Sequence, residues 1–266
     1  MEEHYPVKIS TILVKHKKLI YKIFAIAFWI IIWEAVAVSI DSELIIASPV
    51  KVLTTLISLL KSSKFWTSLL YSTLRIIGGF LLALVLGTAL AALSSKILII
   101  KTLLEPITSV IKATPVASFI IFALIWFGNK NLAIFISFLM VFPVIYLNVL
   151  KGIESTDKKL LEMAKVYKFP PLKVLLYIYL PDVIPFFVSA CSISLGLCWK
   201  SGVAAEVIGI TTGSIGENLY RAKLYFETGE LLAWTAVIIA VSTAFEKLFM
   251  LGLKNAQRAI ERRYRA

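Results

Sequence analysis

Six apolar stretches, five of them close to the thickness of a lipid bilayer as helices and the third shorter, limit what this chain can fold into. An α-helix crosses the hydrocarbon core with about 20 apolar residues. The chain of 266 residues is 59% hydrophobic, well above the roughly 45–50% that is usual in soluble domains. We therefore predict an all-α membrane protein with six transmembrane helices, centred on Ile23–Ile40, Ile76–Leu93, Val116–Phe127, Leu132–Leu150, Phe186–Ile208 and Leu231–Leu253.

The third stretch is the least regular of the six. A second apolar run, Ile97–Ile111, precedes it but contains two charged residues and a proline. Pro115 cannot donate a backbone hydrogen bond, and it disfavours a helical conformation for Thr114 before it. We expect the helix to kink or break at this point.

Small residues recur at about every fourth position of the second stretch. Such a stripe lets helix backbones approach one another closely in lipid, so we predict a close-packed face made of Gly78, Gly79, Ala83, Gly87 and Ala91. Arg75 stands at the mouth of this stretch. We expect its long side chain to carry the charge outward to the bilayer surface.

The segments after the first and the fifth predicted spans contain further sequence patterns that predict local structure. Ser48-Pro49 is typical of a helix start, with serine as the cap and proline just inside. The apolar run Val50–Leu60 is flanked by lysines and is predicted to form an interfacial helix lying on the bilayer. Gly209–Gly229 is predicted to be a glycine-rich loop.

The distribution of basic residues predicts the orientation in the membrane. Six crossings place both termini on one side, together with the short loop at Lys96 and the loop of residues 151–173. That side carries 18 of the 28 Lys and Arg residues, and the opposite side carries six. The positive-inside rule therefore places both termini in the cytoplasm. Orientation and anionic lipid headgroups account for the net charge of +12, and we expect no nucleic-acid partner.

The residue types that catalysis and metal binding require are few. A helix would separate Cys191 and Cys198 by roughly 10 Å, too far for a disulfide. His4 and His16 have no partner at ligand spacing, so we predict no metal site. There is no Gly-Lys-Ser/Thr phosphate loop and no Ser/His/Asp or Cys/His set. We predict that the chain is not an enzyme and binds no cofactor itself.

The stretch Leu161–Pro181 combines many charges with ordered apolar residues between two spans. Lys158–Lys168 is predicted to form a short amphipathic helix. Pro170-Pro171 ends that helix, and Leu172–Leu180 is predicted to form a second one. Two further prolines then mark the return to the fifth span, Pro181 and Pro185. By itself this pattern also fits an ordinary amphipathic loop.

The order of residues in this stretch resembles the EAA loop of binding-protein-dependent ABC importer permeases. In that family Glu-Ala-Ala is followed after three residues by Gly, and after nine more by Ile-x-Leu-Pro. The positions that match in register here are Glu162, Ala164, Ile178, Leu180 and Pro181.

Two positions of this stretch depart from the family pattern. Met163 replaces an alanine, which is a mild change in a helix. Lys168 stands where the family has the glycine that allows a tight turn between two helices. We expect Pro170-Pro171 to make the turn instead, and the local structure to differ here from that of relatives.

The resemblance covers nearly the whole chain and points to the nitrate/sulfonate/taurine branch of these permeases. It rests further on Trp33-Glu34, Ser48-Pro49, Trp199 with Glu206, and Gly213-Ser-Ile-Gly216. It implies the type I ABC importer transmembrane fold, with a cytoplasmic coupling helix between the fourth and fifth spans. It also implies that Glu162, Ala164, Lys168, Ile178, Leu180 and Pro181 couple the chain to an ATPase.

The same resemblance implies partners and a location. Two copies of the permease would form the pathway as a homodimer in a bacterial inner membrane. Two cytoplasmic ATPase subunits would bind ATP and Mg²⁺, and an extracytoplasmic binding protein would deliver the solute. The branch favours a small anion such as a sulfonate, nitrate or bicarbonate, while heterocyclic vitamin precursors stay open.

The resemblance also divides the chain into parts. Residues 1–64 are expected to hold a cytoplasmic N-terminal tail, the first transmembrane helix and the external interfacial helix. Residues 65–253 are expected to form the transmembrane domain, with the coupling loop at about 151–181. Residues 254–266 would form a basic cytoplasmic tail.

An ionisable residue inside a span is a functional candidate by default. Lys200 lies mid-span beside Trp199, six residues before Glu206. One hypothesis is that these three residues line the translocation pathway and that Lys200 attracts an anionic solute. The alternative is a buried ion pair between Lys200 and Glu206 or Glu34.

Two other transporter classes stay open. A self-contained secondary transporter or channel would have no need of Glu162 and would usually show interrupted spans in two related halves. The coupling subunit of an energy-coupling-factor vitamin transporter also docks on ATPases, but through an arginine-based motif in place of Ile-x-Leu-Pro.

Overall fold

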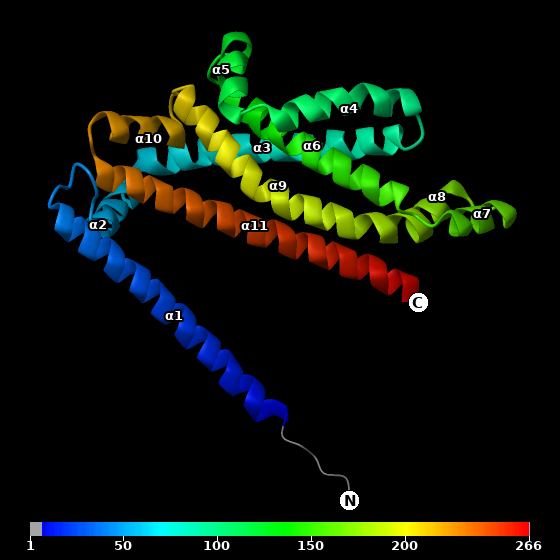
Figure 1. Ribbon diagram of the computed structural model, residues 1–266, viewed down its shortest axis with the longest axis horizontal. Coiled ribbons are helices and arrows are strands. Elements are labelled where there is room, and N and C mark those ends of the chain that lie inside the picture. Colours follow the sequence, from blue (N-terminus) through cyan, green and yellow to red (C-terminus); the bar gives the residue numbers. More distant parts are fainter. Residues whose placement is uncertain (1–6, 266) are drawn as a thin grey trace, which may run out of the picture. The chain divides into compact units, whose positions relative to one another are not determined.

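The computed structural model describes the backbone of residues 7–265 and the side chains of residues 20–258. The regular structure in this range is helical (Figure 1). The helices are α1 (Val7–Ile40), α2 (Pro49–Leu60), α3 (Ser63–Ser94), α4 (Leu98–Ala113), α5 (Val116–Phe127), α6 (Leu132–Glu154), α7 (Lys158–Val166), α8 (Pro171–Val174), the π-helix η1 (Leu175–Tyr179), α9 (Leu180–Ile208), α10 (Ile215–Leu224) and α11 (Thr228–Arg265).

Five of the six predicted spans are confirmed, because five helices in the described range are long and apolar enough to cross a membrane. Helices α4 and α5 form a bent pair, which makes a sixth span if the pair is counted as one. The two halves of that span meet at an angle of 110°. The break lies at Thr114 and Pro115, as the proline predicted.

The predicted position of Arg75 at the mouth of the second span is wrong. Helix α3 begins at Ser63, so Arg75 lies roughly 18 Å along the helix from its start. Its guanidinium group stacks over the ring of Tyr71, 3.9 Å from the ring centre. The stretch before Ile76 contains hydroxyl and aromatic residues that lowered the apolar signal, although they are fully compatible with a helix.

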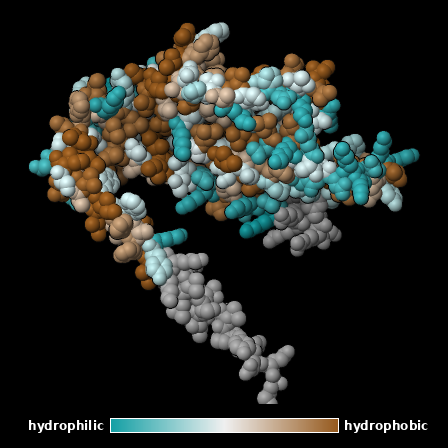
Figure 2. Space-filling view, in the orientation of Figure 1, coloured by the Kyte–Doolittle hydropathy of each residue, from teal (hydrophilic) through white to brown (hydrophobic). Residues whose placement is uncertain are grey.

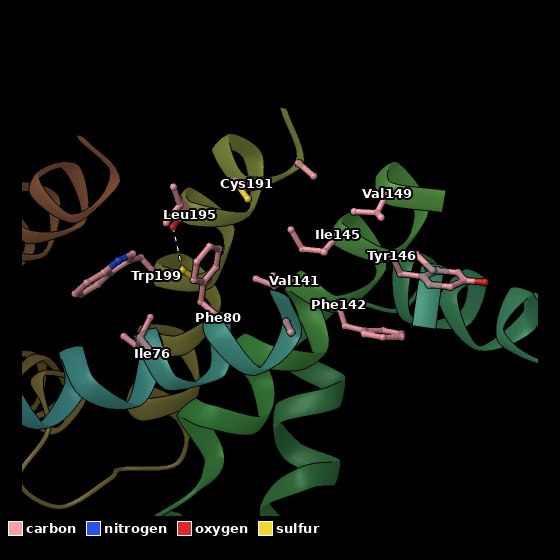
Figure 3. Close-up of a cluster of buried hydrophobic side chains, with 14 of the residues drawn as sticks. Ile76, Phe80, Val141, Phe142, Ile145, Tyr146, Val149, Cys191, Leu195 and Trp199 are labelled. Carbon is pink, nitrogen blue, oxygen red and sulfur yellow. Dashed lines mark hydrogen bonds between the residues drawn. The ribbon is translucent and has the colours of Figure 1, made fainter. Parts of the chain in front are cut away.

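Residues 62–221 and 234–266 form one compact unit. Helices α3, α6 and α9 pack side by side in it and supply its largest hydrophobic cluster. Figure 3 shows Ile76 and Phe80 of α3, Tyr146 and its neighbours on α6, and Trp199 of α9 in this cluster. Phe249 of α11 completes it with an edge-to-face contact to Phe80 at 5.1 Å between ring centres.

The predicted stripe of small residues on α3 forms close contacts with α6. A Cβ added at Gly79 would lie 2.4 Å from the Ile134 carbonyl oxygen of α6. On α9, a Cβ at Gly202 would lie 2.6 Å from Ser137 Oγ. The three backbones therefore approach too closely for any side chain larger than hydrogen. Gly78 is the exception in the stripe, because a Cβ there would meet nothing within 4 Å.

Residues 1–61 and 222–233 form the second unit. Helix α2 begins as predicted, because the Ser48 side chain accepts a hydrogen bond from the Lys51 amide and Pro49 occupies the first turn. Ala47, Val52 and Ala233 are buried together. Trp33 of α1 donates its indole N–H to the Ala47 carbonyl, 3.1 Å away.

Two apolar surfaces of this unit are exposed. Only 6% of the span in α1 is buried, and Figure 2 shows hydrophobic side chains along this helix. Helix α2 exposes a second stripe, made of Val50, Leu53, Ile57 and Leu60. That stripe suits an interfacial helix, and the location of α2 on the bilayer stays a prediction.

Candidate functional site

The predicted coupling segment folds into a short helix, a tight turn and the beginning of a long helix. Helix α7 starts at Asp157, whose carboxylate accepts a hydrogen bond from the Lys159 amide at 2.8 Å. Glu162 is exposed on this helix, whereas Ala164 is buried. Glu162, the first matched residue of the motif, is thus accessible to a partner, whereas Ala164, the second, is not.

The turn after α7 is made by Lys168 itself, so the expectation that Pro170-Pro171 would replace it is wrong. Lys168 has φ +53°, the left-handed conformation that glycine adopts most easily. Its amide bonds to the Lys165 carbonyl at 3.1 Å, and the Phe169 amide bonds to the Ala164 carbonyl at 2.9 Å. This pair of bonds is the Schellman motif. Since the motif satisfies the last carbonyls of α7, lysine accepts the strained conformation.

The second helix of the segment does not stop before the membrane. Prolines 181 and 185 were expected to separate it from a fifth span starting at Phe186, but the helix runs without a break from Pro171 to Ile208. The π-helix η1 lies just before Pro181. A π turn shifts the hydrogen-bond register locally, and we attribute to it the continuation of the helix through residues that lack an N–H group.

Apolar and basic side chains surround Glu162 on the surface of this segment. Figure 2 shows hydrophilic side chains gathered around α7 and α8, with hydrophobic ones among them. The exposed large apolar residues in and next to the segment are Leu160, Met163, Val166, Tyr167, Phe169, Leu172, Leu175, Leu176 and Tyr177. Of the remaining matched positions, Ile178 is buried, Leu180 is half-buried and Pro181 is exposed. Such a surface can bind a groove on another protein, with apolar contacts and one acidic contact.

The structure separates the three predicted pathway residues. Trp199 is 2% exposed and packs in the α3–α6–α9 cluster, and Glu206 is 0% exposed. Lys200 is exposed on another face of α9. No ion pair joins Lys200 to a carboxylate among residues 20–258, so the alternative of a buried Lys200–Glu206 pair is not observed.

The exposed face of α9 that carries Lys200 is unusually polar for a membrane helix. Ser189 and Ser192 precede Lys200 on it, and Gly196 between them and the lysine has open space where a Cβ would be. Ile193 is the large apolar side chain on this face. A charge facing hydrocarbon costs at least about 2.5–3.5 kcal/mol, so this face suits water or another protein surface.

Glu206 holds the start of α10. Its Oε2 atom accepts hydrogen bonds from Ser72 Oγ of α3 at 2.7 Å and from the Gly216 amide at 3.2 Å. Ser72 Oγ in turn accepts from the Ile215 amide at 2.9 Å. Two of the first amides of α10 therefore bond to side chains of other helices.

Helix α10 was missed in the sequence, where Gly209–Gly229 was predicted to be a loop. A signal for it was present in Ser214-Ile-Gly-Glu217, because Ser-x-x-Glu is the pattern of a capping box. Ser214 Oγ accepts from the Glu217 amide at 3.0 Å, and the Glu217 carboxylate accepts from the Gly213 amide at 2.6 Å. The glycines around it suggested flexibility, whereas here they allow a close approach of the backbone.

Residues 79–266 match the family model described as "Binding-protein-dependent transport system inner membrane component". The chain belongs to this family. It is 26% identical over 215 residues to the putative aliphatic sulfonates transport permease protein SsuC of Bacillus subtilis, covering 80% of this chain and 77% of that protein. It is 26% identical over 234 residues to the taurine transport system permease protein TauC of Escherichia coli, covering 86% and 83%. It is 28% identical over 162 residues to the nitrate import permease protein NrtB of Leptolyngbya laminosa, covering 60% and 57%.

These matches confirm the resemblance to ABC importer permeases of the nitrate/sulfonate/taurine branch. The permease is a multi-pass membrane transport protein and not an enzyme, and its helices agree with the all-α type I fold. The roles of Glu162, Lys200 and the other predicted site residues stay predictions.

Proposed function

We propose that this permease forms the translocation pathway of an importer whose energy comes from a separate ATPase, and that it couples to this ATPase through α7 and α8. The observation that carries the proposal is the exposed Glu162 among exposed apolar side chains, at the matched position of the EAA pattern. The ATPase subunits would hold ATP and Mg²⁺, since the permease sequence contains no phosphate-binding loop.

The proposed orientation places both termini, α7 and α8 in the cytoplasm of a bacterial cell. The asymmetry of the basic residues supports it. The tail residues before 20 and after 258 contribute to this asymmetry, and their side chains lie outside the described part. In this orientation α10 lies on the extracytoplasmic side, where a solute-binding protein would dock. A second copy of the permease would complete the pathway.

The continuous helix from Pro171 to Ile208 supports a mechanical route between the two sides. Its 38 residues span about 57 Å at 1.5 Å per residue. A displacement of the coupling segment by the ATPase would move the inner end of this helix directly. The face with Lys200 would follow as part of the same rigid element.

For the solute, we propose a small anion such as a sulfonate, nitrate or bicarbonate. The names of the relatives, which include sulfonate, taurine and nitrate permeases, support this class. Lys200 would attract the anion, because it is exposed and unpaired within the described residues on a face with two serines.

The coupling proposal is tested with Glu162→Arg. The permease is purified from membranes by an affinity tag, and the ATPase that co-purifies is measured. We expect loss of the ATPase and of ATP-dependent uptake, while Glu227→Arg, the same charge change at another exposed carboxylate, leaves both intact. Normal co-purification and uptake with Glu162→Arg would show that the coupling assignment is wrong.

The solute proposal is tested with taurine, ethanesulfonate, nitrate and bicarbonate as separate probes. Lys200→Met should reduce uptake of the transported anion about tenfold or more, because a charge-assisted contact contributes about 1.5–3 kcal/mol. Lys112→Met, which removes another lysine from the transmembrane helices, is the matched control. Equal uptake by the two variants would exclude Lys200 from the pathway.

A further inference from the structure

Glu206 is a fully buried carboxylate whose contacts are structural. It is 0% exposed and lies at the last turns of α9. One of its oxygens accepts two hydrogen bonds, and both come from groups that belong to other segments, the Ser72 hydroxyl and the Gly216 amide. A buried acceptor of this kind organises whatever donates to it, since each lost partner would be left unsatisfied.

We propose that Glu206 is a positioning residue for transport: its side chain fixes α10 to α3 and to the end of α9, so that these three elements move as one body. In the orientation proposed above, α10 then forms a rigid external cap on the helix that carries Lys200. The inference rests on the proposed function for its place in the transport cycle, and on geometry alone for the fixed cap.

The connection between α9 and α10 is hydrogen-bonded both to the backbone and to the side chain of Glu206. The Glu206 backbone carbonyl accepts a hydrogen bond from the Thr211 amide at 3.0 Å, and its side chain accepts from Gly216 further along. Thr211 Oγ1 donates to the Asn129 carbonyl, 3.1 Å away in the turn between α5 and α6. The loop therefore has anchors at its start and at its end.

The contact between residues 206 and 216 is so close that only glycine fits. A Cβ at Gly216 would lie 2.3 Å from the Glu206 Cβ atom and 2.5 Å from its backbone carbonyl carbon. The backbone of α10 thus rests directly on the backbone of α9. Such an approach leaves no room for an intervening water or for a sliding movement.

A second contact holds the next turn of α10 to α3. Asn218 Nδ2 donates to Ser68 Oγ at 3.2 Å and to the Ser214 carbonyl at 2.8 Å. Ser68 lies one turn before Ser72 on α3, so both serines face α10. Lys200 lies six residues before Glu206 on α9, about 9 Å away along the helix axis. A force on α10 would therefore reach the pathway face of α9 without a flexible joint.

The fixed cap is tested by disulfide formation between α3 and α10. The pair Ser68→Cys and Asn218→Cys is introduced, and cross-linking by copper phenanthroline is followed in membranes that contain the permease. The native Cys191 and Cys198 are buried and can stay. We expect rapid cross-linking with Glu206 intact and about tenfold slower cross-linking with Glu206→Ala, since the lost bonds are worth at least about 1.4 kcal/mol.

Three variants separate positioning from other roles. Glu206→Gln keeps an oxygen that can accept from Ser72 and Gly216, so it should cross-link nearly as fast as the parent. If Glu206 instead served as a charge in the pathway, Glu206→Gln would abolish uptake as fully as Glu206→Ala. Ser137→Ala is the matched control, because it removes a buried bond between α6 and α9 that does not involve α10.

The functional outcome is measured with the same cysteine pair. If the cap moves as one body, the formed disulfide leaves uptake of the transported anion intact and restores it in Glu206→Ala. Equal cross-linking rates with and without Glu206, or a disulfide that blocks uptake with Glu206 intact, would overturn the inference. The cross-linking rate needs neither ATPase nor solute, so its failure is distinct from a failure of the Glu162→Arg test.

Discussion

The predicted coupling segment and residues 209–218, called the outer loop for their proposed extracytoplasmic position, each follow a helix that ends in the same way. The two turns differ in what holds them in place. Helix α7 is followed by Lys168 at φ +53°, and α9 is followed by Ile210 at φ +46°. In both cases the next amide bonds to the carbonyl five residues back, at 2.9 and 3.0 Å. Both are Schellman motifs built without the glycine that usually occupies this position.

The difference lies in what surrounds each turn. In the described structure, the hydrogen bonds of residues 157–169 stay within that segment. The outer loop bonds to three other places: Ser72 and Ser68 of α3 and Asn129 of the α5–α6 turn. A segment with only local bonds can open or shift at little cost, whereas one with tertiary bonds moves with its neighbours. Figure 1 shows α7 and α10 at opposite ends of α9.

Gly216→Ala should lower the stability of the permease more than any other substitution considered for these two turns. The added methyl group would lie 2.3 Å from the Glu206 Cβ atom, and overpacking of this kind costs about 3 kcal/mol. We expect a marked loss of thermal stability in detergent. Gly196→Ala is the control, because a Cβ there meets nothing within 4 Å. Equal stability of the two variants would mean that α10 does not rest on α9.

Ser72→Ala should have the next largest effect. It removes the donor to Glu206 and the acceptor for the Ile215 amide, so we expect a loss of about 1–3 kcal/mol in the free energy of unfolding. Ser39→Ala removes an exposed hydroxyl that bonds to its own helix, and it should change stability by less than about 0.5 kcal/mol. Denaturation in mixed micelles measures both, and a small effect of Ser72→Ala would argue against a tightly held cap.

Ile210→Gly should stabilise the outer loop. A β-branched residue in the left-handed region is strained, and release of this strain is worth about 1–2 kcal/mol. Because the loop is held by tertiary bonds, the gain should appear as a higher unfolding temperature of the whole permease. Ile210→Val keeps the β-branch and should give no gain. A gain from valine would point to side-chain contacts instead of backbone strain.

The sequence predicted the spans well because each is a long apolar run with its own hydrogen bonds. It predicted the break at Pro115 and the cap at Ser48 because both depend on one or two local residues. It failed for α10, where polar residues and glycines are satisfied by partners far away in the chain. It also misplaced Arg75, because helix α3 continues through the hydroxyl and aromatic residues before Ile76. Ser72 and Glu206 are 134 residues apart, and the local sequence around either residue does not indicate that they are paired.

The turn at Lys168 was misjudged for a related reason. A propensity argument assigns the turn to prolines, yet the bonds that close α7 require a left-handed residue at position 168. Hydrogen-bond closure therefore outweighs the preference of a single residue. Pro181, which lies just after the π turn, likewise continues the helix instead of ending it.

Lys168→Gly should have the smallest effect on global stability and should act on the coupling segment alone. Glycine removes about 1 kcal/mol of left-handed strain, but α7 is held by local bonds, so the unfolding temperature should hardly move. Local opening of the turn should become about fivefold rarer, measured as slower cleavage of residues 165–170 by a protease in inside-out vesicles.

Lys168→Ala is the control, because it removes the same charge but keeps Cβ. The protease is one that does not cut after basic residues, so that loss of the lysine does not itself remove a cleavage site. Lys168→Ala should then be cleaved at the same rate as the parent. If alanine protects as well as glycine, or if glycine raises the global unfolding temperature as Ile210→Gly does, the coupling turn is bound into the rest of the molecule and the contrast between the two ends is lost.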